Sequence, residues 1–224
     1  MLEQSDRIVF VIYPAGSFGS FLSACLRMSA SVHNKLLNKD IFNEDGAAHN
    51  HVIEYMGSKF HCFEDLTYWV ELSDEQKDEF VAKHWQPPIN LNKSGLFYIH
   101  RLIMPEKIHI FMNYFTKARF VKINVDRPEQ DAVCKMILKK VMPYSPTNSL
   151  LEERIREKVA RRDLINQTNN DIIEGVYNFN VKWFLDGSFV KEFNSLCEYL
   201  NFEKVNTTEI TNMYEEFKRQ NNIC

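Results

Sequence analysis

The chain of 224 residues lacks the features of a membrane protein, a secreted protein or a protein that coats nucleic acid. No apolar run approaches the length that spans a bilayer, and the first residues, MLEQSDR, carry acids where a secretory signal peptide has a basic start. A formal net charge of −3 disfavours broad binding to nucleic acid. We therefore expect a cytoplasmic protein with no membrane span and no nucleic-acid partner.

The cysteines also lack the even number and the spacing that are typical of disulfides or metal sites. The five cysteines are odd in number and include no CxxC pair, so we expect free thiols in a reducing compartment. Four residues in the first third of the chain could suggest a metal cluster, but their spacing matches no zinc pattern; they are His49, His51, His61 and Cys62. We expect no metal.

The strict P-loop motif G-x-x-x-x-G-K-[ST] and the motif G-x-G-x-x-G are both absent. The segment from Arg7 to Arg27, RIVFVIYPAGSFGSFLSACLR, instead joins an unbroken apolar run at 8–13 to a loop rich in glycine and serine. A helix with one apolar face follows, and we expect it to run from about Phe18 to Leu37. Such a unit presents backbone N–H groups to a phosphate, although a tight turn in an ordinary α/β domain has the same pattern. The candidate ligand-binding residues are Gly16, Ser17, Phe18, Gly19, Ser20 and Phe21.

The strand–helix unit recurs, with buried strands predicted at 96–99 and 119–125 and helices after each. This order predicts an α/β fold with a doubly wound, mainly parallel sheet flanked by helices, in one domain over 1–224. An aromatic-rich insertion at about 57–95 could form an acceptor pocket or a lid, or could simply fasten itself to the core. We also expect a helix over 148–165, a last strand at 181–185, a helix after Ser188, and a final helix whose end, RQNNIC, frays.

Ligands of parallel sheets bind at the carboxyl ends of the strands. The glycine–serine loop, His100 and Arg127 all follow predicted strands. We therefore expect these three to lie at one edge of the sheet.

Three segments in this order resemble the sulfotransferase family, whose P-loop-like fold transfers a sulfuryl group from 3′-phosphoadenosine 5′-phosphosulfate (PAPS). VIYPAGSFGSFL is similar to the family's phosphosulfate loop, FYIHR to the segment with the catalytic histidine, and VKINVDRPEQDAVCK to the unit that binds the 3′-phosphate. The closing FNVKWFLDGSFVKEFNSLCEYLNF resembles the family's last strand and helix.

The resemblance implies an enzyme with PAPS as donor substrate, no metal, and a small-molecule or glycan acceptor. His100 would accept the proton of the acceptor hydroxyl or amine, and Arg101 would supply a cation for the growing charge. The 3′-phosphate would be bound by Arg127 together with either Cys134 or Lys135, depending on whether the position is counted from Pro128 or from Arg127.

The segments also depart from the family pattern. Ala15 stands where the family's loop usually has a lysine or arginine, and Arg127 lies one position later than the family's arginine. Two alternatives therefore stay open: a non-catalytic nucleotide-binding protein of sulfotransferase fold, and a small-molecule kinase of P-loop type.

Overall fold

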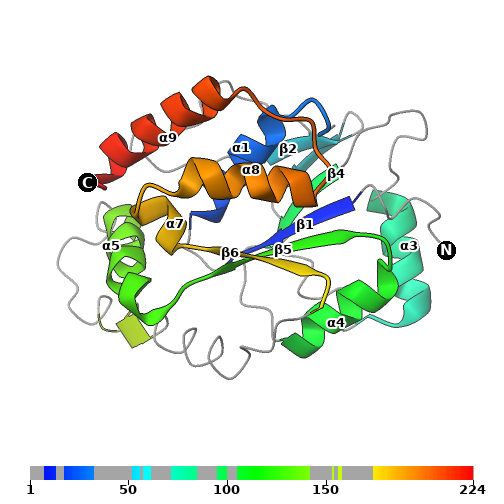
Figure 1. The fold of residues 1–224 in the computed structure, drawn as a ribbon. Coiled ribbons are helices and arrows are strands. Elements are labelled where there is room, and N and C mark those ends of the chain that lie inside the picture. The colour runs from blue at the N-terminus through cyan, green and yellow to red at the C-terminus, as the bar shows by residue number, and fades with distance from the viewer. Residues whose placement is uncertain are drawn as a thin grey trace.

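The structure is a computed structural model that describes residues 8–13, 18–32, 52–55, 58–61, 72–84, 95–99, 105–141, 153, 156–157 and 174–223. Its centre is a sheet of four parallel strands in the order β4-β1-β5-β6 (Figure 1). The strands are β1 (Ile8–Ile12), β4 (Gly95–Ile99), β5 (Arg119–Asn124) and β6 (Val176–Asn180). The predicted α/β fold with a parallel sheet is confirmed.

The central strand β1 is buried along its whole length because helices cover both faces of the sheet. On one face, Phe10 stacks on Phe120 of β5, and its ring also contacts Phe111 and Phe115 at α4 (Pro105–Tyr114). Strand residues at the intervening positions point to the opposite face of the sheet. One of them is Phe179 of β6, which pairs with Ile123 of β5. An apolar strand with no polar position is therefore what this location requires.

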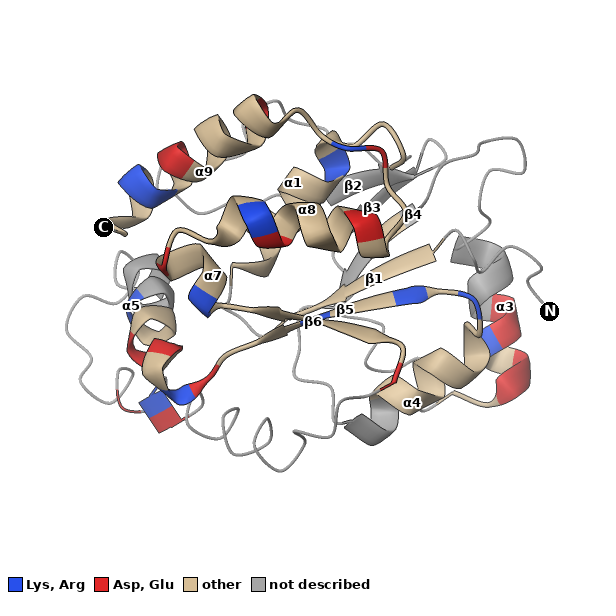
Figure 2. Cartoon of the chain, viewed as in Figure 1, with Lys and Arg blue, Asp and Glu red and all other residues tan. Residues whose placement is uncertain are grey.

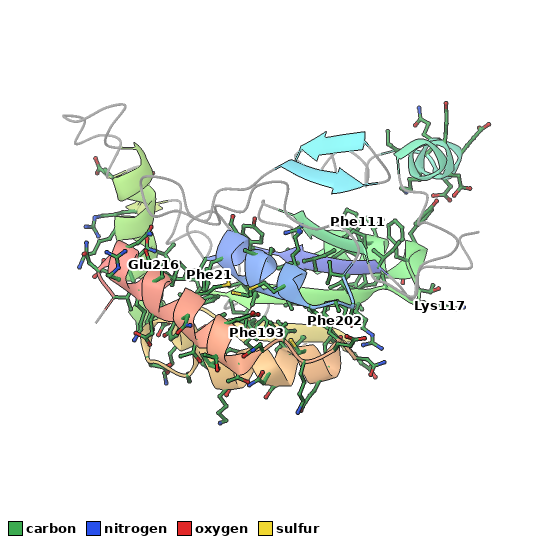
Figure 3. All side chains as sticks on the ribbon, turned by 90° about the horizontal axis from the view of Figure 1, so that it is seen from above. Phe21, Phe111, Lys117, Phe193, Phe202 and Glu216 are labelled. Carbon is green, nitrogen blue, oxygen red and sulfur yellow. The ribbon has the colours of Figure 1, made fainter. Side chains whose placement is uncertain are left out.

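Four helices cover the opposite face: α1 (Gly19–Met28), α7 (Lys182–Leu185), α8 (Phe189–Tyr199) and α9 (Thr207–Asn221). Phe184 of α7 joins them, because its ring contacts Phe18, Phe21, Phe179, Phe189 and Phe217. Phe21 stacks on Phe217 with ring centroids 4.2 Å apart, and Figure 3 shows Phe21 between α1 and α9. This aromatic cluster holds the start of α1 against the end of the chain.

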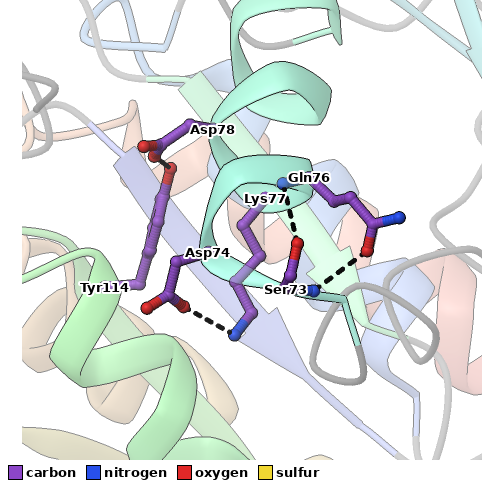
Figure 4. A network of polar contacts seen from close by, with 6 residues as sticks. All are labelled: Ser73, Asp74, Gln76, Lys77, Asp78 and Tyr114. Carbon is purple, nitrogen blue, oxygen red and sulfur yellow. Dashed lines mark hydrogen bonds and ion pairs between the residues drawn. The ribbon is translucent and has the colours of Figure 1, made fainter.

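Outside the sheet, β2 (Val52–Tyr55) and β3 (Ser58–His61) pair as a separate antiparallel hairpin. α3 (Asp74–His84) starts with a capping box, in which the Ser73 N–H donates to Gln76 Oε1 at 3.0 Å and the Gln76 N–H donates to Ser73 Oγ at 3.3 Å (Figure 4). The Tyr114 hydroxyl donates to Asp78, which ties α3 to α4. The predicted role of the aromatic side chains of 57–95 lies outside the described residues.

Two sequence-based expectations about element boundaries are wrong. The first helix ends at Met28, because the Ser29 hydroxyl accepts a hydrogen bond from the Ser31 N–H at 3.2 Å and so turns the chain. Residues 182–185 form helix α7 rather than a strand, because Asn180 Oδ1 accepts from the Lys182 N–H at 2.8 Å and starts a helical turn. The last strand, β6, lies earlier in the chain.

The expectation that RQNNIC frays is also wrong as far as Ile223. α9 continues to Asn221 and is closed by Asn222 in the left-handed conformation, with φ 55°. Of the helix predicted over 148–165, the structure describes residues 153, 156 and 157, which are helical. In the described part of the chain, no helix is long and apolar enough to cross a membrane.

Candidate functional site

The connection from β1 to α1 lies at the point where the sheet reverses its strand order. β1 has β4 on one side and β5 on the other. The chain passes from β1 to β4 on one side and from β5 to β6 on the other, so the connections that leave the neighbouring strands β1 and β5 run in opposite directions across the sheet. In open parallel sheets, a ligand crevice forms at the carboxyl ends of the strands at such a point. The predicted loop is therefore where the fold favours a ligand.

The start of α1 is shaped by Tyr13, the residue after β1. A Cβ atom on Gly19 would lie 2.0 Å from Cγ of the Tyr13 ring, so only glycine fits beneath this ring. The Tyr13 hydroxyl also forms a hydrogen bond of 3.1 Å with Ser20 Oγ. Phe18 precedes the helix in the left-handed conformation, with φ 62°, and its carbonyl accepts the Leu22 N–H at 3.0 Å. The first-turn N–H groups of α1 therefore begin at Gly19.

A pocket of about 470 Å³ opens beside this helix end. Its lining comes from the start of α1, from α5 (Gln130–Val141), from α7 and from the end of α9. The lining residues are Phe18, Ala132, Lys135, Leu185, Asn221, Asn222 and Ile223. Figure 1 shows the C-terminal end of the chain next to α5, at the end of the sheet to which β5 and β6 run. Two sequence-predicted site residues, Phe18 and Lys135, therefore share one pocket.

Lys135 and Cys134 are the two predicted alternatives for the residue that binds the 3′-phosphate together with Arg127, and they have different surroundings. Lys135 is exposed on α5 and makes no ion pair with any residue in the described ranges. The Cys134 side chain is only 3% exposed and belongs to the hydrophobic core. Of the two, Lys135 is the one that a ligand in the pocket can reach.

The third predicted phosphate ligand, Arg127, begins the short 3₁₀ helix η2 (Arg127–Glu129) after β5. Its side chain is exposed and does not line the pocket. The two remaining loop residues, Gly16 and Ser17, and the predicted catalytic residues, His100 and Arg101, lie outside the described residues. Their roles stay predictions.

Carboxylates lie in the segments that follow β5 and β6 (Figure 2). Asp126 accepts a hydrogen bond of 2.5 Å from Asn180 Nδ2, and Asp186 accepts one of 3.0 Å from the Ser188 N–H. Burial, together with the charge of Asp126, raises the pKa of Glu129. None of these carboxylates lines the pocket, so Lys135 is its one charged lining residue in the described part of the chain.

Sequence reasoning missed the residues that α9 and α7 contribute to the pocket, above all Asn221, Asn222 and Ile223. The pair Asn221–Asn222 carried a signal, since asparagine readily closes a helix in the left-handed conformation. That signal marks the end of a helix and does not indicate a pocket.

No protein-family model matches the chain, and no curated protein matches it at a significant level. Among the described residues, no group of three or more histidine, cysteine, aspartate or glutamate side chains could hold a metal ion.

Proposed function

We propose that the protein binds PAPS in the pocket between α1 and α5 and transfers its sulfuryl group to an acceptor hydroxyl or amine. One observation carries the proposal: Phe18, at the start of α1, and the exposed cation of Lys135 line the same pocket at the carboxyl edge of a parallel sheet.

The shape and charge of the pocket support a phosphorylated ligand. The N-terminal end of α1 carries a partial positive charge and N–H groups without acceptors inside the helix, and Lys135 adds a full positive charge across the pocket. A volume of about 470 Å³ is within the range of small-molecule sites, and the Phe18, Leu185 and Ile223 side chains offer apolar surface to a base or sugar.

The choice of PAPS over other nucleotides comes from the sequence resemblance. In that reading, the loop at 16–21 holds the phosphosulfate and Lys135 holds the 3′-phosphate. His100 accepts the acceptor's proton while the new S–O or S–N bond forms and the S–O bond to the phosphate breaks. The loop N–H groups and Arg101 stabilise the negative charge that grows on the transferring and leaving oxygens during this step.

A second candidate is a protein that binds the nucleotide without transferring the group. It is favoured by the position of Arg127, which does not line the pocket, and by the engagement of the Ser20 hydroxyl with Tyr13. Both observations leave Lys135 as the single cationic side chain among the described residues that line the pocket.

Calorimetric titration with 3′-phosphoadenosine 5′-phosphate, with AMP and with ATP tests the proposal. We expect the bisphosphate to bind more tightly than AMP, and Lys135→Ala to weaken bisphosphate binding by about tenfold or more, because a charged hydrogen bond to the 3′-phosphate is lost. Lys191→Ala is the matched control, since it removes an exposed lysine of α8 that does not line the pocket.

Absence of bisphosphate binding would exclude both candidates. Binding with no sulfuryl transfer from PAPS to any acceptor in a broad screen would favour the non-catalytic protein. Magnesium-dependent ATP binding would indicate a kinase instead.

A further inference from the structure

Polar side chains lie on the face of the sheet that α4 covers. Phe120, Lys122 and Asn124 alternate along β5 and therefore point to one face, which the stacking of Phe120 on Phe10 identifies as the α4 face. Phe120 ends the apolar part of this face, and Lys122 and Asn124 follow it toward the carboxyl end of β5. The aromatic core thus gives way to polar groups within one strand.

The neighbouring strands complete the surroundings of Lys122. Its register partners are Ile12 of β1 and Asn178 of β6, so an aliphatic side chain and an amide flank it on the same face. Lys122 is half-buried, and burial lowers its pKa. Within the described ranges, it has neither an ion pair nor a hydrogen bond.

Asn124, two residues after Lys122 on the same face of β5, has a buried acceptor. Asn178 Nδ2 donates to the Val176 carbonyl at 3.4 Å, so its Oδ1 is the atom that accepts from Asn124 Nδ2, at 3.0 Å. This chain of bonds orients the Asn124 amide and leaves its Oδ1 buried with no donor in the described structure. Lys122 and Asn124 are two residues apart on one strand, so their Cα atoms are about 7 Å apart. A small ligand is long enough to bridge this distance.

We propose that Lys122, Asn124 and Asn178 form a binding site for the acidic group of a small molecule that also carries a hydroxyl or amino donor. The anion pairs with the Lys122 ammonium group, and the donor satisfies Asn124 Oδ1. A half-buried charge and a buried acceptor that both lack partners among the described residues are costly, and one such ligand removes both costs. The site does not depend on the proposed function, because none of its residues lines the pocket that contains Phe18 and Lys135.

Inorganic phosphate and sulfate form a matched pair of probes. At neutral pH, phosphate has both anionic oxygens and an O–H donor, whereas sulfate has only acceptors. The experiment uses a Lys135→Ala protein whose lysines are ¹³C-dimethylated, a modification that keeps their charge. The NMR signal of Lys122 is assigned by its loss in Lys122→Met. Because Lys135→Ala removes the cation of the pocket that contains Phe18, the anion titration of Lys122 is independent of the nucleotide titration that tests the proposed function.

We expect phosphate to shift the Lys122 signal at concentrations about tenfold lower than sulfate, since only phosphate donates to Asn124. Asn124→Leu, which is similar in size and has no acceptor, should abolish this preference while the protein remains folded by circular dichroism. An unshifted Lys122 signal with both anions would overturn the proposal. Equal responses to the two anions would also overturn it, because the site requires the Asn124 acceptor.

Discussion

At the scale of single residues, the contact between Gly19 and the Tyr13 ring determines how the chain enters α1. The ring occupies the space that any side chain at position 19 would need. The Tyr13 hydroxyl then reaches Ser20, so one aromatic residue contacts two successive positions of the first turn. The geometry of the proposed phosphate-binding turn therefore depends on Tyr13 as much as on the glycine.

Gly19→Ala should lower the free energy of unfolding by about 3 kcal/mol or more, because either the Tyr13 ring or α1 must move to admit the new Cβ. Urea unfolding measures the loss. Gly187→Ala is the control: its Cβ meets nothing within 4 Å, and its φ of +83° alone should cost roughly 1–2 kcal/mol. Equal losses in the two variants would show that the Tyr13 contact does not constrain the turn.

Cys197 gives a prediction for alkaline pH. Burial, and to a smaller extent the charge of Glu198, raises the pKa of Cys197 to about 12. The unfolded chain loses this thiol proton near pH 9 while the folded chain keeps it, so stability is complete below pH 9 and declines as the pH rises toward 12. The expected slope is about 1.4 kcal/mol per pH unit for each retained proton.

Urea unfolding between pH 8 and pH 11 would measure that slope. Cys197→Ala should show a smaller decline than the unaltered protein, since the alanine side chain has no proton to lose. The same slope in both proteins would contradict the assignment to Cys197.

At the scale of elements, the start of α3 and the end of α9 are stabilised by different caps. α3 begins with the reciprocal bonds of Ser73 and Gln76, and α9 ends with Asn222 in the left-handed conformation. The α9 cap is close to the candidate site, because it directs Asn222 and Ile223 into the pocket lining.

Asn222→Val should release the end of α9, because a β-branched residue in the left-handed conformation costs about 1–2 kcal/mol. We expect faster hydrogen exchange of the last turn of α9 and weaker binding of 3′-phosphoadenosine 5′-phosphate. Asn222→Gly, which adopts the conformation without strain, should preserve the protection of the helix. Unchanged exchange in the valine variant would refute the role of the cap.

Ser73→Ala should destabilise the first turn of α3 by about 1 kcal/mol, since the Gln76 N–H loses its side-chain acceptor. Hydrogen exchange of the α3 amides reports this directly. Ser73→Asp keeps an acceptor at the cap and should restore protection; if it does not, the Ser73 bond is not what stabilises this end.

The elements that could be predicted from the sequence are those whose pattern reflects their burial. The run at 8–13, the strand at 96–99 and the apolar face at 105–115 are each found where expected, because a strand or helix covered by the core needs such residues. The run at 181–185 is also mostly apolar, yet the Asn180 side chain starts a helix there. The hydrogen bond from the Lys182 N–H to the Asn180 side chain favours a helix in this segment, and the apolar composition does not reveal it.

At the scale of the whole molecule, the ring of Phe184 connects parts of the chain that are far apart in sequence. It contacts aromatic residues of α1, β6, α8 and α9 at once. Phe184→Ala should therefore lower the free energy of unfolding by about 3–5 kcal/mol. Fluorescence and far-UV circular dichroism should report one shared unfolding transition, because both ends of the chain depend on this contact.

Ile110→Ala is the control for that experiment. Ile110 is 37% exposed on α4, so its truncation should change stability far less. Two separate transitions in the Phe184 variant would mean that the β1–α1 unit and the C-terminal helices are not one cooperative structure.

The candidate site could be predicted only in part for the same long-range reason. Phe18 and Lys135 each follow a strand of the parallel sheet, and parallel strands bring such residues to one edge. Asn221, Asn222 and Ile223 reach the pocket because α9 packs on Phe21 through Phe217. That packing is a property of the assembled core, and no local pattern around residue 221 reveals it.

The position of Ile223 in the pocket wall has a practical consequence for handling the protein. Any polypeptide attached after this residue leaves from the rim of the pocket, close to Lys135 and Phe18. An affinity tag there would compete with the ligands to be tested, whereas Ile8, which opens β1, starts at the opposite end of the sheet (Figure 1). Binding assays should therefore use protein from which any tag after Ile223 has been removed.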